Sequence, residues 1–217
     1  MLQRLEFGAS YVYAPRGQSQ LSQTAKRYVG ALKRGDSHLL PQFVQRIVLH
    51  AQQGEFPNFF GPAVTLIPVP GSAPLVKGGL WVPLLLANAF RDSGLARDVA
   101  PVISRIAPVR KSAFAAAADR PNVQQHYDSL TVQVVKPAPT HIVLIDDVVT
   151  QGCTFLAAAS RLAEAYPDAE IRGFAIVRTM SRAGVEVDQI VAPRTGTISS
   201  PCVGTIEARR DRAVRRP

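Results

Sequence analysis

The chain has 217 residues, enough for one substantial hydrophobic core and few for two, so we expect a single domain with additions. Hydrophobic residues make up 47% of it and charged residues 19%, which excludes a disordered or low-complexity chain. No apolar run approaches the roughly 18 residues of a membrane span, and the first residues are unlike a signal peptide. Cys153 and Cys202 alone cannot form a disulfide framework or a zinc site of four cysteines. We therefore expect a cytoplasmic protein without a membrane partner.

Positive charge is the unusual feature of the composition, because 25 Lys and Arg against 16 Asp and Glu give a formal net charge of +9. Such a balance suits a nucleic acid, a polyphosphate or a small anionic ligand. Five arginines lie close to the end of the chain: Arg209, Arg210, Arg212, Arg215 and Arg216. No aromatic residue lies among them to stack on bases, so we favour a solvated basic tail. Nucleic-acid binding through this tail is the alternative.

The first part of the chain predicts one strand and two helices. A strand followed by a turn is expected over residues 11–17. Apolar residues at helical spacing predict amphipathic helices over 21–33 and 39–51, and both helices are expected to pack on a core. Residues 55–62 are rich in Phe, Pro and Gly and are interpreted as a connection.

From residue 63 onward, apolar strands alternate with amphipathic helices. The expected elements are a strand at 63–69, a loop at 71–79, a helix at 81–92, a strand at 99–106, a long loop or a loop with one helical turn at 107–129, a strand at 141–145, a helix at 155–166, a strand at 170–178 and a short strand at 187–191 in an otherwise irregular tail. This alternation predicts an α/β fold, a parallel sheet with helices on both faces. The strand at 141–145 is apolar after its first residue, so it should be central.

The most informative segment follows that central strand. Asp146 and Asp147 are placed at the carboxyl edge, where open parallel sheets bind their ligands. Adjacent acids point to opposite sides, so one can accept hydrogen bonds from vicinal hydroxyls while the other meets a hydrated divalent cation. The small and hydroxylic residues 150–154 then lead into a helix whose first N–H groups, with Gly152 allowing close approach, favour an anion. The segment predicts a sugar-phosphate site; the simpler alternative is a solvated turn and a helix cap.

Residues 142–154 resemble the phosphoribosyl diphosphate (PRPP) signature of type I phosphoribosyltransferases: four apolar residues, two acids, two apolar residues and Thr-x-Gly-x-Thr. Gln151 departs from it, since Ser, Thr, Ala or Arg is usual there. Similarity extends weakly over about 63–178, where Ile67-Pro68-Val69-Pro70 is similar to the diphosphate loop of the ComF-like and amidophosphoribosyltransferase-like branch. That branch often carries an N-terminal four-cysteine zinc module, which this chain lacks.

The resemblance implies a twisted parallel sheet flanked by helices, with an N-terminal helical or hood addition. Residues 1–62 would be this hood or an oligomer contact, 63–192 the core and 193–217 an irregular basic tail. A homodimer is expected.

The resemblance also implies an enzyme that binds Mg²⁺ and PRPP and transfers the phosphoribosyl group to a nitrogenous acceptor with release of diphosphate. Asp146 and Asp147 would hold the ribose hydroxyls and, through water, Mg²⁺. The 5′-phosphate residues would be Thr150, Gln151, Gly152, Cys153 and Thr154. The diphosphate residues would be Gly71, Ser72, Lys77 and Arg105. Arg110 and Lys111 would close over the leaving group from a mobile loop, although each basic residue is equally well explained as a surface charge.

The acceptor and the catalytic competence stay open at this point. Purine-salvage members of the family carry an acid where Thr150 stands, which argues mildly against a 6-oxopurine acceptor. Binding PRPP does not require turning it over. A catalytically silent PRPP-sensing regulator with a basic surface for nucleic acid or a partner is therefore the alternative function.

Overall fold

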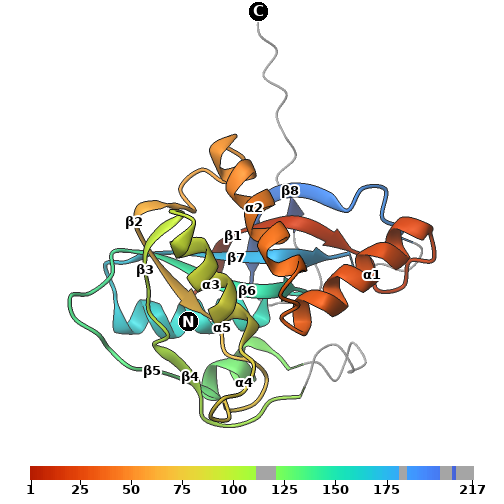
Figure 1. Cartoon of the computed structure of the whole chain (residues 1–217). Coiled ribbons are helices and arrows are strands. Elements are labelled where there is room, and N and C mark those ends of the chain that lie inside the picture. The colour runs from red at the N-terminus through yellow and green to blue at the C-terminus, as the bar shows by residue number, and fades with distance from the viewer. Residues whose placement is uncertain (111–120, 181–184, 201–206, 209–217) are drawn as a thin grey trace, which may run out of the picture.

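The computed structural model describes residues 1–110, 121–180, 185–200 and 207–208. These residues form a seven-stranded sheet, in the order β3-β2-β6-β7-β1-β8-β9, and a separate two-stranded sheet (Figure 1). The parallel strands of the seven-stranded sheet are β1 (Arg4–Tyr13), β2 (Gly61–Pro68), β3 (Ala96–Val99), β6 (His141–Val149) and β7 (Glu170–Thr179). The antiparallel additions at one edge are β8 (Val191–Ser199) and β9 (Glu207–Ala208).

Helices cover the sheet on both faces. One face carries α1 (Gln20–Lys33), α2 (Leu39–Gln52) and α3 (Val82–Asp92), and the other carries α5 (Cys153–Ala165). The small sheet pairs β4 (Ile103–Arg105) with β5 (Leu130–Val132), and α4 (Val123–Asp128) precedes β5. None of the helices in the described ranges has the length and hydropathy needed to span a bilayer.

The two faces of β6 explain its continuous apolar run. Ile142 and Leu144 belong to the core cluster that contains α5, whereas Val143 and Ile145 belong to the cluster under α2 and α3. A strand covered on both faces needs apolar residues at successive positions rather than at alternate ones. The structure therefore confirms the predicted fold class, a mostly parallel sheet flanked by helices.

Most predicted elements are confirmed. The helices expected at 21–33, 39–51, 81–92 and 155–166 are α1, α2, α3 and α5, and the strands expected at 63–69, 141–145 and 170–178 are β2, β6 and β7. The loop expected at 71–79 is also present. Within the loop predicted at 107–129, the described residues include the short helix α4, and residues 111–120 lie outside the described part of the chain.

The N-terminal strand was predicted too short. β1 begins at Arg4 rather than at residue 11, and it lies inside the main sheet between β7 and β8. Its early residues alternate between exposed and buried, with Arg4 and Glu6 outside and Leu5 and Phe7 inside, which is the period of a strand. The segment assigned to a hood thus contributes a strand to the sheet of the core.

Two further predictions were wrong. The single strand expected over 99–106 is divided, because β3 ends at Val99 and β4 begins at Ile103 in another sheet. Pro101 lies between them, and proline has no N–H to donate to a ladder. The short strand expected at 187–191, with an irregular tail after 192, is instead β8, which begins at Val191 and continues to Ser199 along β1. The five arginines near the end lie outside the described residues.

Phe174 is predicted to be a large contributor to stability. It is fully buried on β7 and makes edge contacts with Phe56, Phe60 and Phe90. Phe174→Ala should lower the free energy of unfolding by about 3–5 kcal/mol because it leaves a cavity. Leu49→Ala, at a side chain 43% exposed, should change it by less than about 1 kcal/mol. Urea unfolding compares the two, and equal effects would contradict this account of the core.

Candidate functional site

The strand order places a crevice at the carboxyl ends of β2 and β6. β2 lies between β3 and β6, so the chain leaves β2 toward one side of the sheet and reaches β6 on the other. The helices that follow these two strands, α3 and α5, cover opposite faces. In open parallel sheets, the point at which the strand order reverses in this way is where ligands bind. Asp146 and Asp147 come directly after Ile145, the last residue of β6 that pairs with β2, and so lie at this crevice.

The two acids lie where β6 outruns β2. The last paired residues of β2 and β6 are Pro68 and Ile145, whereas β6 continues along β7 as far as Val149. Asp146 and Asp147 are thus in the final part of the strand, not beyond it as expected, and β7 flanks them on one side only. Each carboxylate accepts a 2.8 Å hydrogen bond from the backbone N–H of the following residue.

The electrostatics of the pair favour a cation. Burial, together with the carboxylate of Asp147, raises the pKa of Asp146 well above its usual range, and Lys33 at the end of α1 opposes this rise. Among the described residues, no group of three or more His, Cys, Asp or Glu side chains could hold a metal. Mg²⁺ is commonly bound by one or two carboxylates, with water and substrate oxygens completing its shell. The pair fits such a partial site.

The predicted phosphate loop forms one pocket with the first acid. Residues 150–154 line it together with Asp146, while Asp147 does not line it, as expected for neighbours on opposite sides of a strand. Gly152 is the N-cap of the 13-residue helix α5, and no side chain caps that end. An uncapped helix N-terminus at a pocket favours an anion through its first N–H groups and the helix dipole.

The conformation and the position of Gly152 both favour glycine. Its φ of +83° lies in the left-handed region, and a Cβ atom there would come within 2.6 Å of Cδ1 of Ile198. Ile198 belongs to β8, so this strand packs directly against the loop. The sequence analysis did not anticipate this contact, because it expected residues 193–217 to be irregular.

The second predicted loop follows β2 and is fastened from several sides. The backbone N–H of Val109 donates to the carbonyl of Ser72 at 2.8 Å, and Nε1 of Trp81 donates to the carbonyl of Val69 at 2.9 Å. The Arg105 guanidinium donates to the carbonyl of Gly71. The structure thus holds Gly71 and Ser72 at the carboxyl end of β2.

The predicted cations of the diphosphate site lie at different places. Arg110 is exposed and follows Val109, so it lies beside Ser72. Lys77 is exposed farther along the same loop, and Lys111 lies outside the described residues. Arg105 differs most from the expectation of an open ligand, since it is only 4% exposed and its guanidinium bonds within the protein. This geometry suits a residue that positions the Gly71 loop.

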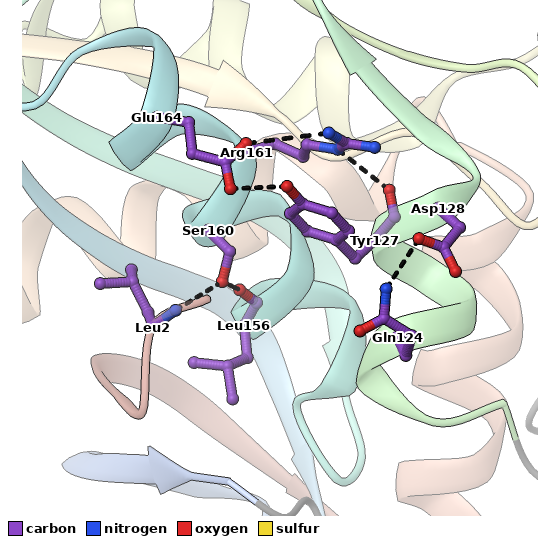
Figure 2. Close-up of polar contacts among 8 residues, drawn as sticks. All are labelled: Leu2, Gln124, Tyr127, Asp128, Leu156, Ser160, Arg161 and Glu164. Carbon is purple, nitrogen blue, oxygen red and sulfur yellow. Dashed lines mark hydrogen bonds and ion pairs between the residues drawn. The ribbon is translucent and has the colours of Figure 1, made fainter.

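His126 is a pocket residue that the sequence analysis missed. It lies on α4, and α4 is docked on α5 by its neighbour Tyr127 (Figure 2). The Tyr127 hydroxyl donates to Glu164 at 2.5 Å, and Arg161 both donates to the Tyr127 carbonyl at 3.1 Å and lies 3.7 Å from the centre of its ring. The only sequence signal was the Asn122 to Gln125 capping box that begins α4.

The His126 ring is buried against the phosphate loop. Its Nε2 lies 3.5 Å from Oγ1 of Thr154, and its buried Nδ1 has no hydrogen-bond partner in the described part of the chain. Burial and the nearby charge of Arg105 lower the pKa of His126 to about 4. The imidazole is therefore neutral at physiological pH, with one buried ring nitrogen lacking a protein partner.

Comparisons with known proteins were made at the levels of family, sequence and structure. No protein-family model matches the chain, and no curated protein is significantly similar to it in sequence. Among solved structures, adenine phosphoribosyltransferase from Leishmania tarentolae is 16% identical with a TM-score of 0.39, over 74% of this chain and 88% of that one. The enzyme from Leishmania donovani is 13% identical with a TM-score of 0.35, over 84% and 86%. The fold is defined by the strand order and by the helices on both faces of the sheet.

The contact between Gly152 and Ile198 gives a stability prediction. Gly152→Ala should cost the left-handed backbone penalty of about 1–2 kcal/mol and, in addition, the overlap with Ile198. Gly54→Ala is the matched control, since Gly54 has φ +79° and open space around its Cβ direction. Urea unfolding should show a greater loss of stability for Gly152→Ala than for Gly54→Ala. The cost of Gly152→Ala should be smaller when it is measured in an Ile198→Ala background, where the overlap is absent. Equal losses for the two glycine variants would contradict the packing of β8 on the loop.

The low pKa of His126 gives a pH prediction. The unfolded chain takes up this proton near pH 6.5 and the folded chain only near 4, so stability from this group falls as the pH drops between those values. The loss should be roughly 3 kcal/mol. Urea unfolding of the wild-type protein and His126→Gln from pH 7.5 to 4 isolates the effect, because the opposite contribution of Asp146 is common to both. Parallel pH profiles would contradict the buried neutral ring.

Proposed function

We propose that this chain binds Mg²⁺ and PRPP and transfers the phosphoribosyl group to a nitrogenous acceptor with release of diphosphate. The observation that supports it most is the pocket that combines Asp146 with residues 150–154 at the uncapped start of α5. A carboxylate for ribose hydroxyls beside a helix N-terminus for a phosphate suits a sugar phosphate. The fastened loop at Gly71 and Ser72, at the end of the adjacent strand, supplies a place for diphosphate.

The reaction needs positioning and charge stabilisation more than covalent chemistry. The bond between the anomeric carbon and a diphosphate oxygen breaks, the acceptor nitrogen bonds to that carbon, and the proton that this nitrogen releases goes to the departing diphosphate or to water. In the proposal, Asp146 accepts hydrogen bonds from the ribose, and the α5 N-terminus fixes the 5′-phosphate. Arg110 stabilises the departing negative charge from its place beside Ser72. Bound Mg²⁺, held by Asp146 and Asp147 through water, would neutralise diphosphate.

The finer parts of the proposal rest on the sequence resemblance. Membership of the ComF-like branch, a cytoplasmic location and a homodimer stay predictions, as does a diphosphate contact by Lys77 or Lys111. The acceptor is a nitrogenous compound of unassigned structure. Thr150 offers a hydroxyl rather than an acid at the pocket, which continues to argue against a 6-oxopurine.

The acid pair provides the test of this function. Asp146→Asn combined with Asp147→Asn should weaken Mg²⁺-dependent PRPP binding at least about 100-fold, because hydrogen bonds to charged groups are worth roughly 1.5–3 kcal/mol each. The free energy of unfolding should not fall, since the variant removes the mutual repulsion of two adjacent, half-buried carboxylates. Asp168→Asn, an exposed acid in the turn before β7, is the matched control.

Titration calorimetry with PRPP and Mg²⁺ measures the binding. Unchanged affinity in the double variant would refute the assignment of the acids. Diphosphate release with a panel of nitrogenous acceptors then separates an enzyme from the alternative, a PRPP-sensing regulator, which would bind without turnover.

A further inference from the structure

We propose that a buried hydrogen-bond chain through Arg105 couples the two loops of the site, so that occupation of the Gly71 loop changes the affinity of the phosphate loop at 150–154, and the reverse. The inference rests on the proposed function, because it assigns the diphosphate half of PRPP to one loop and the ribose 5-phosphate half to the other. It identifies Arg105, Ser129 and His126 as positioning residues rather than as groups that touch the reacting atoms.

The first half of this hydrogen-bond chain joins the Gly71 loop to the residue before β5. Arg105 is the last residue of β4, and its guanidinium donates from Nε to the carbonyl of Gly71 and from Nη1 to the hydroxyl of Ser129. Ser129 immediately precedes β5, and the backbone N–H of Ile106 donates to its carbonyl at 2.9 Å. The register pairs Arg105 with Leu130, so the backbone of Arg105 is held in a two-stranded antiparallel sheet.

The second half joins Ser129 to the phosphate loop. The Ser129 hydroxyl donates to the carbonyl of His126 at 2.6 Å, and Nε2 of His126 lies 3.5 Å from Oγ1 of Thr154. Ser129, His126 and Arg105 are each 4% exposed, so water does not substitute easily for these contacts. Because Tyr127 docks the same short helix on α5, movement of His126 and movement of the loop are linked (Figure 2).

Because Arg105 is charged and buried, the hydrogen bonds that connect the two loops depend on the position of its guanidinium. A buried guanidinium is costly unless its donors are satisfied, and in the described residues it makes no ion pair within 4 Å. Its nearby negative group is Asp146, whose charge raises the pKa of Arg105 against the effect of burial. A shift of Gly71 when diphosphate binds would therefore displace the guanidinium, and with it the hydroxyl that holds α4.

The main sheet offers a second route between the loops, since β2 and β6 are directly paired and the N–H of Val69 donates to the carbonyl of Ile145. A decisive variant must therefore interrupt the hydrogen bonds between Arg105 and His126 and leave the residues of both loops and of the sheet unchanged. Ser129→Ala removes the hydroxyl that lies between Arg105 and His126, and this hydroxyl makes no direct contact with either loop. The matched control is Ser160→Ala. Ser160 is a buried serine on α5 that bonds to Leu2 and Leu156 and takes no part in the hydrogen-bond chain through Arg105 (Figure 2).

The test uses inorganic pyrophosphate and ribose 5-phosphate as probes of the two loops, with Mg²⁺ constant throughout. Calorimetry gives the affinity for each probe alone and in the presence of the other, and the ratio is the coupling factor. Factors of about 5–150 are usual for coupled sites. We expect the coupling factor of the wild-type protein to differ at least 5-fold from that of Ser129→Ala. Ser160→Ala should match the wild-type protein.

The outcomes separate this inference from the proposed function. Equal coupling factors in the wild-type protein and Ser129→Ala would overturn the inference alone, whereas failure of both probes to bind the wild-type protein would overturn the proposed function with it. Hydrogen exchange on the wild-type protein covers the case in which Ser129→Ala does not fold. Pyrophosphate alone should then slow amide exchange in residues 123–128 and 150–156, and unchanged exchange there would overturn the coupling.

Discussion

The site depends on the unequal lengths of two paired strands. β2 ends at Pro68, opposite Ile145, and β6 continues along β7 to Val149. Without this overhang, the two acids would be enclosed on both sides by neighbouring strands. With it, Asp146 lines the pocket, and the chain turns through Gly152 into α5 beside that pocket. The sugar-binding and phosphate-binding halves of the proposed site thus follow from one register.

A buried cation connects this overhang to the rest of the site. Arg105 bonds to Gly71 on one side and Ser129 on the other, and its charge lies near Asp146. It lies outside the main sheet because the strand is interrupted at Pro101, after which β4 pairs antiparallel with β5. A local backbone rule therefore decides that this arginine becomes an internal support instead of an open ligand.

The elements that have a distinctive local residue pattern could be predicted from the sequence. The apolar run of β6, the acid pair at its end and the turn at 150–154 into α5 were all identifiable, because strand burial, helix starts and glycine turns are local properties. The features that were missed depend on contacts distant in sequence. β1 pairs with β7, β8 pairs back onto β1, and Ile198 meets Gly152 only after both pairings. His126 enters the pocket because α4 docks on α5, which no residue spacing indicates.

The most direct test of the central claim is a crystal structure of the chain with PRPP and Mn²⁺ in place of Mg²⁺, in which anomalous scattering locates the metal. The account predicts the 5′-phosphate at the N-terminus of α5, ribose hydroxyls at the acids of β6, and diphosphate with the metal between those acids and the Gly71 loop. PRPP bound elsewhere, or a metal remote from Asp146 and Asp147, would contradict it.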